Sequence, residues 1–292
     1  MISAIDGSSD LWWNGRVKTR SLVLLSLCVS AATSQAVTTL PVGPITFGSN
    51  ADYDNNFKEG TNGSLQRIID SVRVSSIDAS AVGFGSALYD TSVTPGTGGA
   101  GGTGGTNANN DLSNFTVTSL IQFQNRGQQS TAGYFLRMND SATSGYLATA
   151  TFYDTSGTVH VRFDLFENVT LDFNPASSGT ATGPTGSIAS QSIVFPTVAA
   201  TNFNFSVTAV GADFTFRLSN LTNTTSVSTT LTDTVSPTLS AGQVGMFIRA
   251  QGQAGGSTSR MDDFTITIPE PSSVLLFGSA ASLLLLRRHK RG

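Results

Sequence analysis

His160 is the first residue to consider for chemistry, because it is the one histidine of residues 37–268. Arg162 and Asp164 follow it at alternate positions of a strand-like run, which places the three side chains on one face of a strand. A Ser-His-Asp triad on an α/β scaffold would also need a G-x-S-x-G turn leading into a helix, and no such turn is present. We therefore interpret His160 as a surface residue.

Paired carboxylates are the second chemistry to test. Glycoside hydrolysis needs two facing carboxyl groups, one of them kept protonated. Residues 37–268 contain two glutamates, Glu59 and Glu167, and the nominal aspartate substitutes are Asp154, Asp164 and Asp172. Nothing in their spacing distinguishes them from solvated strand positions, so the sequence predicts a protein that is not an enzyme.

Two acidic clusters are candidates for a structural Ca²⁺, which prefers carboxylate and carbonyl oxygens. Asp52 and Asp54 lie in a run that continues with two asparagines, and Asp262 and Asp263 are adjacent. The first run lacks the glycine and glutamate of a complete calcium loop. The alternative interpretation is a turn cluster and the start of a strand. No other cofactor is predicted.

Composition excludes several further classes. The chain has 292 residues and a formal net charge of −3, which argues against nucleic acid as a partner. Cys28 is the one cysteine, so residues 37–268 form neither a disulfide nor a thiolate metal site. Residues 96–101 fit G-x-G-x-x-G, but no helix follows them, so we reject dinucleotide binding.

Alternation with a period of two dominates residues 37–268 and predicts strands with one buried and one solvated face. The clearest runs are Phe115–Phe123, Val159–Leu165, Phe203–Ala209, Phe214–Leu218 and Phe264–Ile268. Turn residues separate them, and the one short helical pattern is Leu65–Val72. The prediction is an all-β domain, an antiparallel β-sandwich or jelly roll.

Two glycine-rich stretches interrupt this pattern, at residues 95–110 and 176–186. Strand-like sequence continues on both sides of each stretch. We therefore expect flexible surface loops of one domain rather than linkers between domains.

The N-terminus has the order of a secretory signal peptide. Lys18 and Arg20 precede an apolar run over residues 22–32, and a small-x-small cleavage site ends at Ala36. We expect a signal helix within residues 1–36. Residues 1–16 are unusually long and acidic for such a peptide, which favours a true start at position 17.

The C-terminus consists of three consecutive segments. Pro269-Glu270-Pro271 cannot continue a strand or a helix interior. Residues 272–286 are uncharged and rich in leucine, and as a helix they would extend about 22 Å, less than a bilayer core of about 30 Å. Basic residues follow and would hold the end in the cytoplasm: Arg287, Arg288, Lys290 and Arg291.

This order resembles the PEP-CTERM sorting signal of exported bacterial proteins over residues 269–292. The resemblance implies that an exosortase, a membrane transpeptidase-like enzyme, recognises Pro269-Glu270-Pro271 and removes the tail. The membrane is a second implied partner, and the mature protein would reach the cell surface or an exopolysaccharide matrix. The alternative is a permanent C-terminal membrane anchor.

Residues 120–268 resemble a concanavalin A-like (laminin G-like) jelly roll. The resemblance rests on the runs Phe203–Gly211, Asp213–Leu218, Gly242–Ile248 and Met261–Ile266.

Two functions remain. The first is a non-catalytic surface or matrix protein associated with exopolysaccharide. The second is a lectin-like module or a glycoside-active enzyme, in which the aromatic residues for sugar stacking would be Tyr53, Tyr89, Tyr134, Tyr146 and Tyr153.

Overall fold

A computed structural model describes most of residues 44–268. The described ranges are 44–61, 65–74, 82–105, 112–123, 130–175, 184–196, 202–222, 224–234, 239–253, 256–257 and 259–268. All of them belong to one compact unit that begins at Val42. The expected signal helix and the expected hydrophobic C-terminal helix lie outside the described residues.

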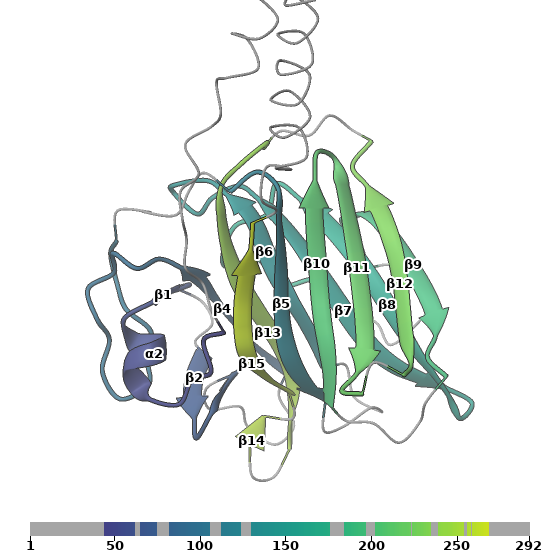
Figure 1. Ribbon diagram of the computed structural model, residues 1–292, viewed down its shortest axis with the longest axis horizontal. Coiled ribbons are helices and arrows are strands. Elements are labelled where there is room, and N and C mark those ends of the chain that lie inside the picture. Colours follow the sequence, from purple (N-terminus) through teal and green to yellow (C-terminus); the bar gives the residue numbers. More distant parts are fainter. Residues whose placement is uncertain are drawn as a thin grey trace, which may run out of the picture. The chain divides into compact units, whose positions relative to one another are not determined.

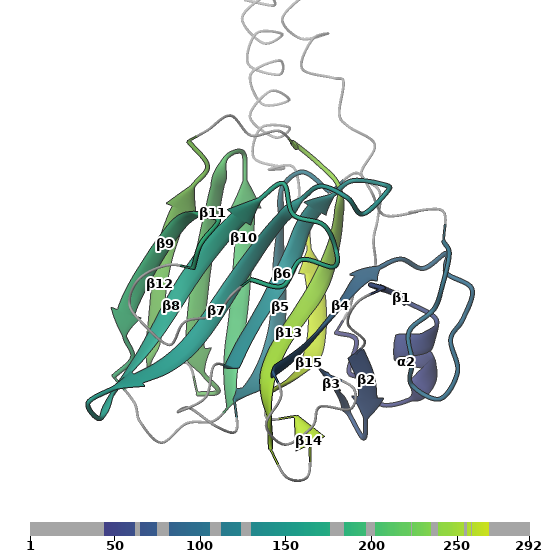
Figure 2. The same ribbon diagram turned by 180° about the vertical axis from the view of Figure 1, so that it is seen from behind.

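The described chain is a sandwich of two antiparallel sheets (Figure 1). The first sheet has the strand order β1-β4-β13-β6-β7-β8-β9, with β14 paired to β13. Its strands are β1 (Phe57–Glu59), β4 (Val82–Tyr89), β6 (Ser130–Met138), β7 (Tyr146–Thr155), β8 (Thr158–Glu167), β9 (Ser187–Val194), β13 (Gln243–Gln253) and β14 (Gly256–Ser257). Figure 2 shows this sheet from its own side.

The second sheet has seven strands in the order β12-β11-β10-β5-β15-β3-β2. They are β2 (Leu65–Ile68), β3 (Ser71–Val74), β5 (Phe115–Phe123), β10 (Asn202–Val210), β11 (Asp213–Asn220), β12 (Ser226–Thr232) and β15 (Ser259–Thr267). One short helix, α2 (Asn50–Asp54), is described. The predicted all-β antiparallel sandwich is therefore confirmed.

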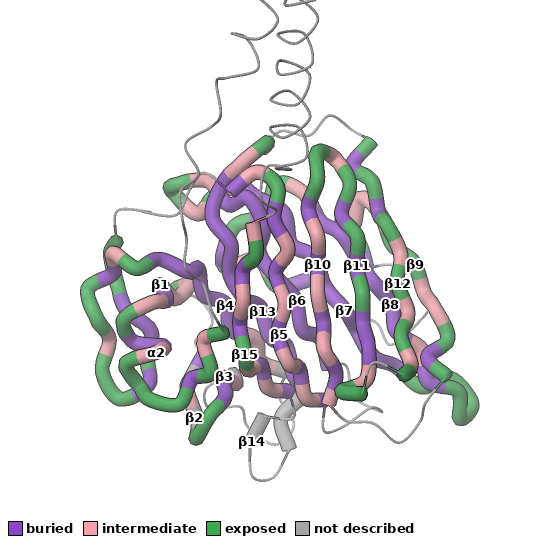
Figure 3. The backbone as a smooth tube through the Cα atoms, in the orientation of Figure 1, coloured by how far each residue is buried: buried purple, intermediate pink, exposed green. Residues whose placement is uncertain are grey.

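The core lies between the two sheets and follows the alternation seen in the sequence. In β5 and β10 every second residue is buried and its neighbours are partly exposed, a pattern that Figure 3 shows along the strands. Phenylalanines dominate the buried positions, and each contributes about 1.5–3 kcal/mol by leaving water. Tyr134 of β6 stacks on Phe205 of β10 at 5.0 Å between ring centroids, which joins the two sheets.

A second apolar cluster covers the other face of the first sheet. Val169 and Leu171, from the segment after β8, pack there together with Phe135, Leu147 and Phe247. This explains why β6 is buried along its whole length instead of alternating. The outer face of the seven-stranded sheet lacks such a cover over β5, β10 and β11, where the outward positions are partly or fully exposed.

One local expectation was wrong. The helical pattern at Leu65–Val72 is a β-hairpin of β2 and β3, because Ile69 takes a positive φ of 59° in the turn and reverses the chain. The glycine-rich stretch is packed where it is described, to residue 105: Gly96 N–H bonds to the carbonyl of Asp54, and Gly102 N–H bonds to that of Phe57. Its glycines allow close backbone contact with α2 and β1.

Candidate functional site

The expected export residues lie outside the described part of the chain. This applies to the cleavage residue Ala36, to Pro269, Glu270 and Pro271, and to the basic cluster at residues 287–291. Within the described ranges, no helix is long and apolar enough to cross a membrane. A functional site on the described residues therefore has to lie on the sandwich itself.

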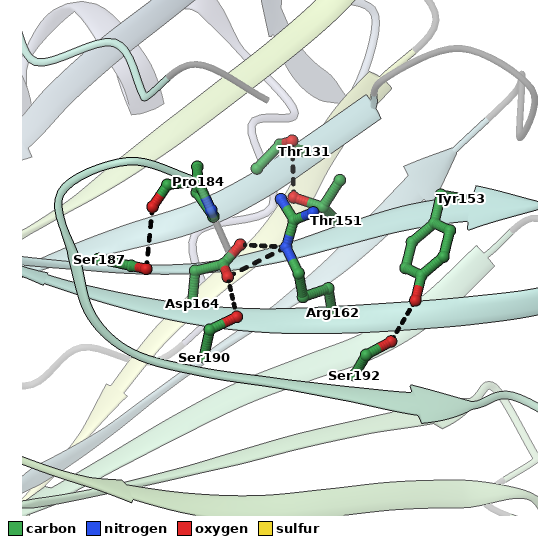
Figure 4. A network of polar contacts seen from close by, with 9 residues as sticks. All are labelled: Thr131, Thr151, Tyr153, Arg162, Asp164, Pro184, Ser187, Ser190 and Ser192. Carbon is green, nitrogen blue, oxygen red and sulfur yellow. Dashed lines mark hydrogen bonds and ion pairs between the residues drawn. The ribbon is translucent and has the colours of Figure 1, made fainter. Parts of the chain in front are cut away.

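The strand face of His160 holds a buried ion pair (Figure 4). Arg162 Nε donates to both carboxylate oxygens of Asp164, at 2.9 and 3.0 Å, and the two side chains are 0% and 1% exposed. The hydroxyl of Ser190 on β9 also donates to Asp164, at 2.6 Å. Burial raises the pKa of Asp164, while Ser190 and Arg162 act against that rise.

This cluster has a structural role. His160 stacks on Tyr153 at 5.0 Å rather than contacting Asp164 as in a triad. Removing one partner of a buried ion pair costs about 3–5 kcal/mol, because the other charge is left unpaired. The Ser190–Asp164 bond joins β9 to β8, and Figure 4 shows a second contact to β9, between Tyr153 of β7 and Ser192.

Three of the other carboxylates considered for glycoside chemistry accept hydrogen bonds from their own surroundings. Asp154 accepts a hydrogen bond from Gly157 N–H at 2.8 Å in the β7–β8 turn. Asp172 accepts one from the Thr61 hydroxyl at 2.5 Å. Glu59 accepts bonds from the Tyr53 hydroxyl and Leu65 N–H. Each of these carboxylates therefore stabilises the turn or segment that donates to it.

The candidate Ca²⁺ ligands also have local partners. Asp52 accepts a bond from Ser49 N–H at 2.7 Å and caps α2, while Asp54 accepts one from Gly99 N–H at 3.3 Å. Asp262 accepts one from Asp263 N–H at 2.7 Å in a bulge of β15. Among the described residues, no three metal-ligating side chains of the His, Cys, Asp and Glu types come together.

The five tyrosines considered for sugar stacking are all buried, at 0–6% exposure. Their rings belong to the core, and four of their hydroxyls have assigned partners: Glu59 for Tyr53, Phe205 carbonyl for Tyr134, Asp233 for Tyr146 and Ser192 for Tyr153. The idea that tyrosines replace tryptophan in a stacking site was therefore wrong, because the core needs these rings.

A shallow hollow lies where β6 ends and β13 begins. It has a volume of about 420 Å³ and is lined by Met138, Asn139–Ser141, Leu239 and Ala241–Gly242. The Asn139 side-chain oxygen already accepts bonds from Thr143 N–H and Ser144 N–H, so its amide serves the local turn. Few recognition groups remain there.

The outer face of the seven-stranded sheet offers a larger array, which we call the hydroxyl face. The registers place five threonines in one row across β12, β11, β10, β5 and β15: Thr230, Thr215, Thr208, Thr116 and Thr267. All five are partly or fully exposed. Because neighbouring strands lie 4.7–4.9 Å apart, this row is about 19 Å long.

A second row of the hydroxyl face runs beside the first. It consists of Ser228, Arg217, Ser206, Thr118 and Thr265 on the same five strands. Some hydroxyls bond to one another across strands: Thr116 to Thr208 and Thr215 to Thr230, each at 2.9 Å. Such bonds orient the hydroxyls and leave each oxygen with further donor or acceptor capacity.

The sequence carried one signal for this face. Thr116-Val117-Thr118 and Thr265-Ile266-Thr267 alternate hydroxyl and apolar residues, so the outward parity of each strand was visible. The two rows could not be predicted from the sequence, because they depend on which strands are neighbours and on the register between them.

No protein-family model matches the chain, and no curated protein matches it. Solved structures that resemble it include the carbohydrate-binding module CBM66 from Bacillus subtilis, with 17% identity, a TM-score of 0.40 and coverage of 73% of this chain and 96% of that chain. Lectin II from Ulex europaeus is 12% identical, with a TM-score of 0.43 and coverage of 72% and 91%. The exoplasmic/lumenal domain of VIP36 is 10% identical, with a TM-score of 0.44 and coverage of 72% and 82%. These likenesses concern the fold alone.

Proposed function

We propose that this chain is a non-catalytic polysaccharide-binding β-sandwich and that the hydroxyl face holds the sugar chain. The observation that carries the proposal is the pair of aligned rows, ten side chains on five strands, nine of which end in a hydroxyl. Serine and threonine hydroxyls both donate and accept hydrogen bonds, as sugar hydroxyls do. A row of about 19 Å contacts several sugar rings in succession.

The bonding of the carboxylates supports binding without catalysis. Asp154, Asp164 and Asp172 each accept a hydrogen bond from their own surroundings. A glycosidase instead holds two carboxyl groups on either side of the scissile bond. The hydroxyl face itself carries no such pair within its two rows.

The experiment is the triple substitution Thr116→Val, Thr208→Val and Thr215→Val in the full-length chain. Valine keeps the shape and the strand preference of threonine but removes the hydroxyl. Each lost hydrogen bond contributes about 0.5–1.5 kcal/mol, so we expect binding to polysaccharide gels to weaken at least tenfold in affinity electrophoresis. The gels should include the neutral glucan dextran and the polyuronate alginate.

The matched control is Thr155→Val with Thr158→Val, a facing threonine pair in the hairpin of the other sheet. Both residues are exposed, so the control removes surface hydroxyls without touching the proposed face. We expect unchanged mobility shifts. Equal weakening by the triple variant and the control, or no retardation of the wild-type chain by any gel, would contradict the proposal.

In this proposal the chain reaches its polysaccharide by export. Support comes from the sequence, in which a signal peptide ends at Ala36 and a PEP-CTERM-like tail begins at Pro269. The tail is removed at Pro269-Glu270-Pro271 by an exosortase, and the sandwich stays at the cell surface or in the matrix.

A further inference from the structure

A third row on the same sheet contains two arginines at facing positions. β15 places Arg260 opposite Arg73 of β3, and their inward neighbours Met261 and Val72 are fully buried. Arg260 and Arg73 therefore point to the outer face, and both are partly exposed. Like charges directly opposite each other destabilise a sheet. The sheet is therefore expected to gain something else from this arginine pair that offsets the repulsion.

The arginine pair has no anionic partner in the described part of the chain. The ion pair that is present there joins Arg162 to Asp164 on the other sheet. The Nε atoms of Arg73 and Arg260 are buried and have no hydrogen-bond acceptor among the described residues. Burial, followed by the charge of Arg260, lowers the pKa of Arg73, as expected for an uncompensated cation.

Other arginines of the molecule are used differently. Arg67 donates to the carbonyls of Phe47 and Gly48 and to the Asn50 side chain. Arg137 donates to the carbonyls of Ser113 and Gly211. These guanidinium groups tie loops to the sandwich, whereas the Nε atoms of Arg73 and Arg260 have no acceptor among the described residues.

Two amides continue the row. Gln122 of β5 lies opposite Arg260, and Asn202 of β10 lies opposite Gln122. The Asn202 side-chain oxygen is buried and also lacks a donor among the described residues. The order Asn202, Gln122, Arg260 and Arg73 spans about 14 Å and runs parallel to the hydroxyl rows, with the row of Asn204, Leu120 and Asp262 between them.

We propose that Arg73 and Arg260 bind the acidic groups of an anionic polysaccharide, the carboxylates of a polyuronate, while Gln122 and Asn202 contact its hydroxyls. This rests on the proposed function and names its ligand class. Arginine binds carboxylates with two parallel hydrogen bonds, which suits two guanidinium groups side by side. The chain has a net charge of −3, so general attraction to a polyanion is not the cause.

The test compares Arg260→Gln with Lys58→Gln in the full-length chain. Lys58 lies on β1 of the other sheet and is partly exposed, so both variants lose one positive charge while the control leaves the proposed face intact. The probes are alginate, carboxyl-reduced alginate, dextran sulfate and dextran in affinity electrophoresis. We expect Arg260→Gln to weaken alginate binding about tenfold or more and to leave dextran binding unchanged, while Lys58→Gln changes alginate binding less than about threefold.

Arg73→Gln should reproduce Arg260→Gln, and Arg260→Lys should give an intermediate loss because lysine keeps the charge without the fork. Because each glutamine variant removes one of the two facing positive charges, and with it their repulsion, neither variant should lower the melting temperature. A lower melting temperature would assign the pair a structural role and overturn the inference. Equal loss in Lys58→Gln would overturn it too.

The probes separate the two proposals. Binding of dextran and alginate with equal affinity overturns the inference and leaves the proposed function standing. Failure to bind any of the four polymers contradicts the proposed function itself. Loss of binding on carboxyl reduction supports carboxylates as the ligand, and a preference for dextran sulfate over alginate overturns that assignment in favour of sulfate esters.

Discussion

Asp262 shows what a single side chain experiences at the edge of the hydroxyl face. Burial raises its pKa to about 6, Asp263 N–H opposes that rise, and the charges of Asp263 and Asp70 add to it. The folded state therefore favours the protonated carboxyl more than the unfolded chain does. The stability that follows is complete below the ordinary pKa of 3.8 and is lost as the pH rises through about 6.

The substitution Asp262→Asn tests this at the residue scale. Asparagine stays neutral and keeps an oxygen that can accept the Asp263 N–H bond. We expect the variant to be more stable than wild type at pH 8 by about 1 kcal/mol, after discounting for solvent screening, and to lose that advantage at pH 4. Urea denaturation at both values measures it, and parallel pH profiles for the two proteins would contradict it.

Individual side chains were the hardest feature to predict. Arg162 and Asp164 were correctly placed on one strand face with His160, yet their burial depends on packing above that face, which no local pattern reports. Arg73 and Arg260 are 187 positions apart in the numbering and become neighbours only through the pairing of β15 with β3. The sequence offered no signal for that pair.

The segment that packs against α2 is informative at the scale of one element. Its composition suggested mobility, but a Cβ atom at Gly101 would lie 2.7 Å from Glu59 Cγ and 3.0 Å from the Phe57 carbonyl oxygen. Glycine at position 101 therefore allows a close contact with β1 that any other residue would crowd.

Gly101→Ala should therefore destabilise the fold by about 1–3 kcal/mol, because the added methyl group overpacks the contact with β1. Gly48→Ala is the control. Its Cβ would meet nothing closer than 3.6 Å, so we expect it to be neutral or to stabilise by about 0.4–1 kcal/mol. Urea denaturation compares the two, and equal stability of both variants would show that residues 95–105 do not pack in solution.

The strands themselves were predicted well, because alternation reports directly on a half-buried sheet. Phe115–Phe123 was expected as a strand and is β5 with the same bounds. The sequence failed where alternation was absent: β6 is buried on both faces, since residues 169–171 cover it, and its run Ser130–Met138 was not singled out.

At the scale of the whole molecule, the proposed export makes a claim about covalent structure. If the tail is a sorting signal, the protein recovered from the surface of its native cells should end near Ile268–Pro271. Intact mass and C-terminal peptide sequencing measure this. A retained end at residues 287–292 would instead indicate the permanent anchor.

The hydroxyl face and the core occupy opposite parities of the same strands. In β5 the residues Phe115, Val117 and Ile121 build the interior, while Thr116, Thr118 and Gln122 meet the outside. Each of these strands therefore carries two sets of residues, an inward set and an outward set, that can be substituted independently. Substitutions at the outward positions can therefore change the surface chemistry while the inward residues keep the sandwich intact. Insertion of a single residue within a strand should not be tolerated, since the shift would turn the core residues outward and the hydroxyl-bearing residues inward.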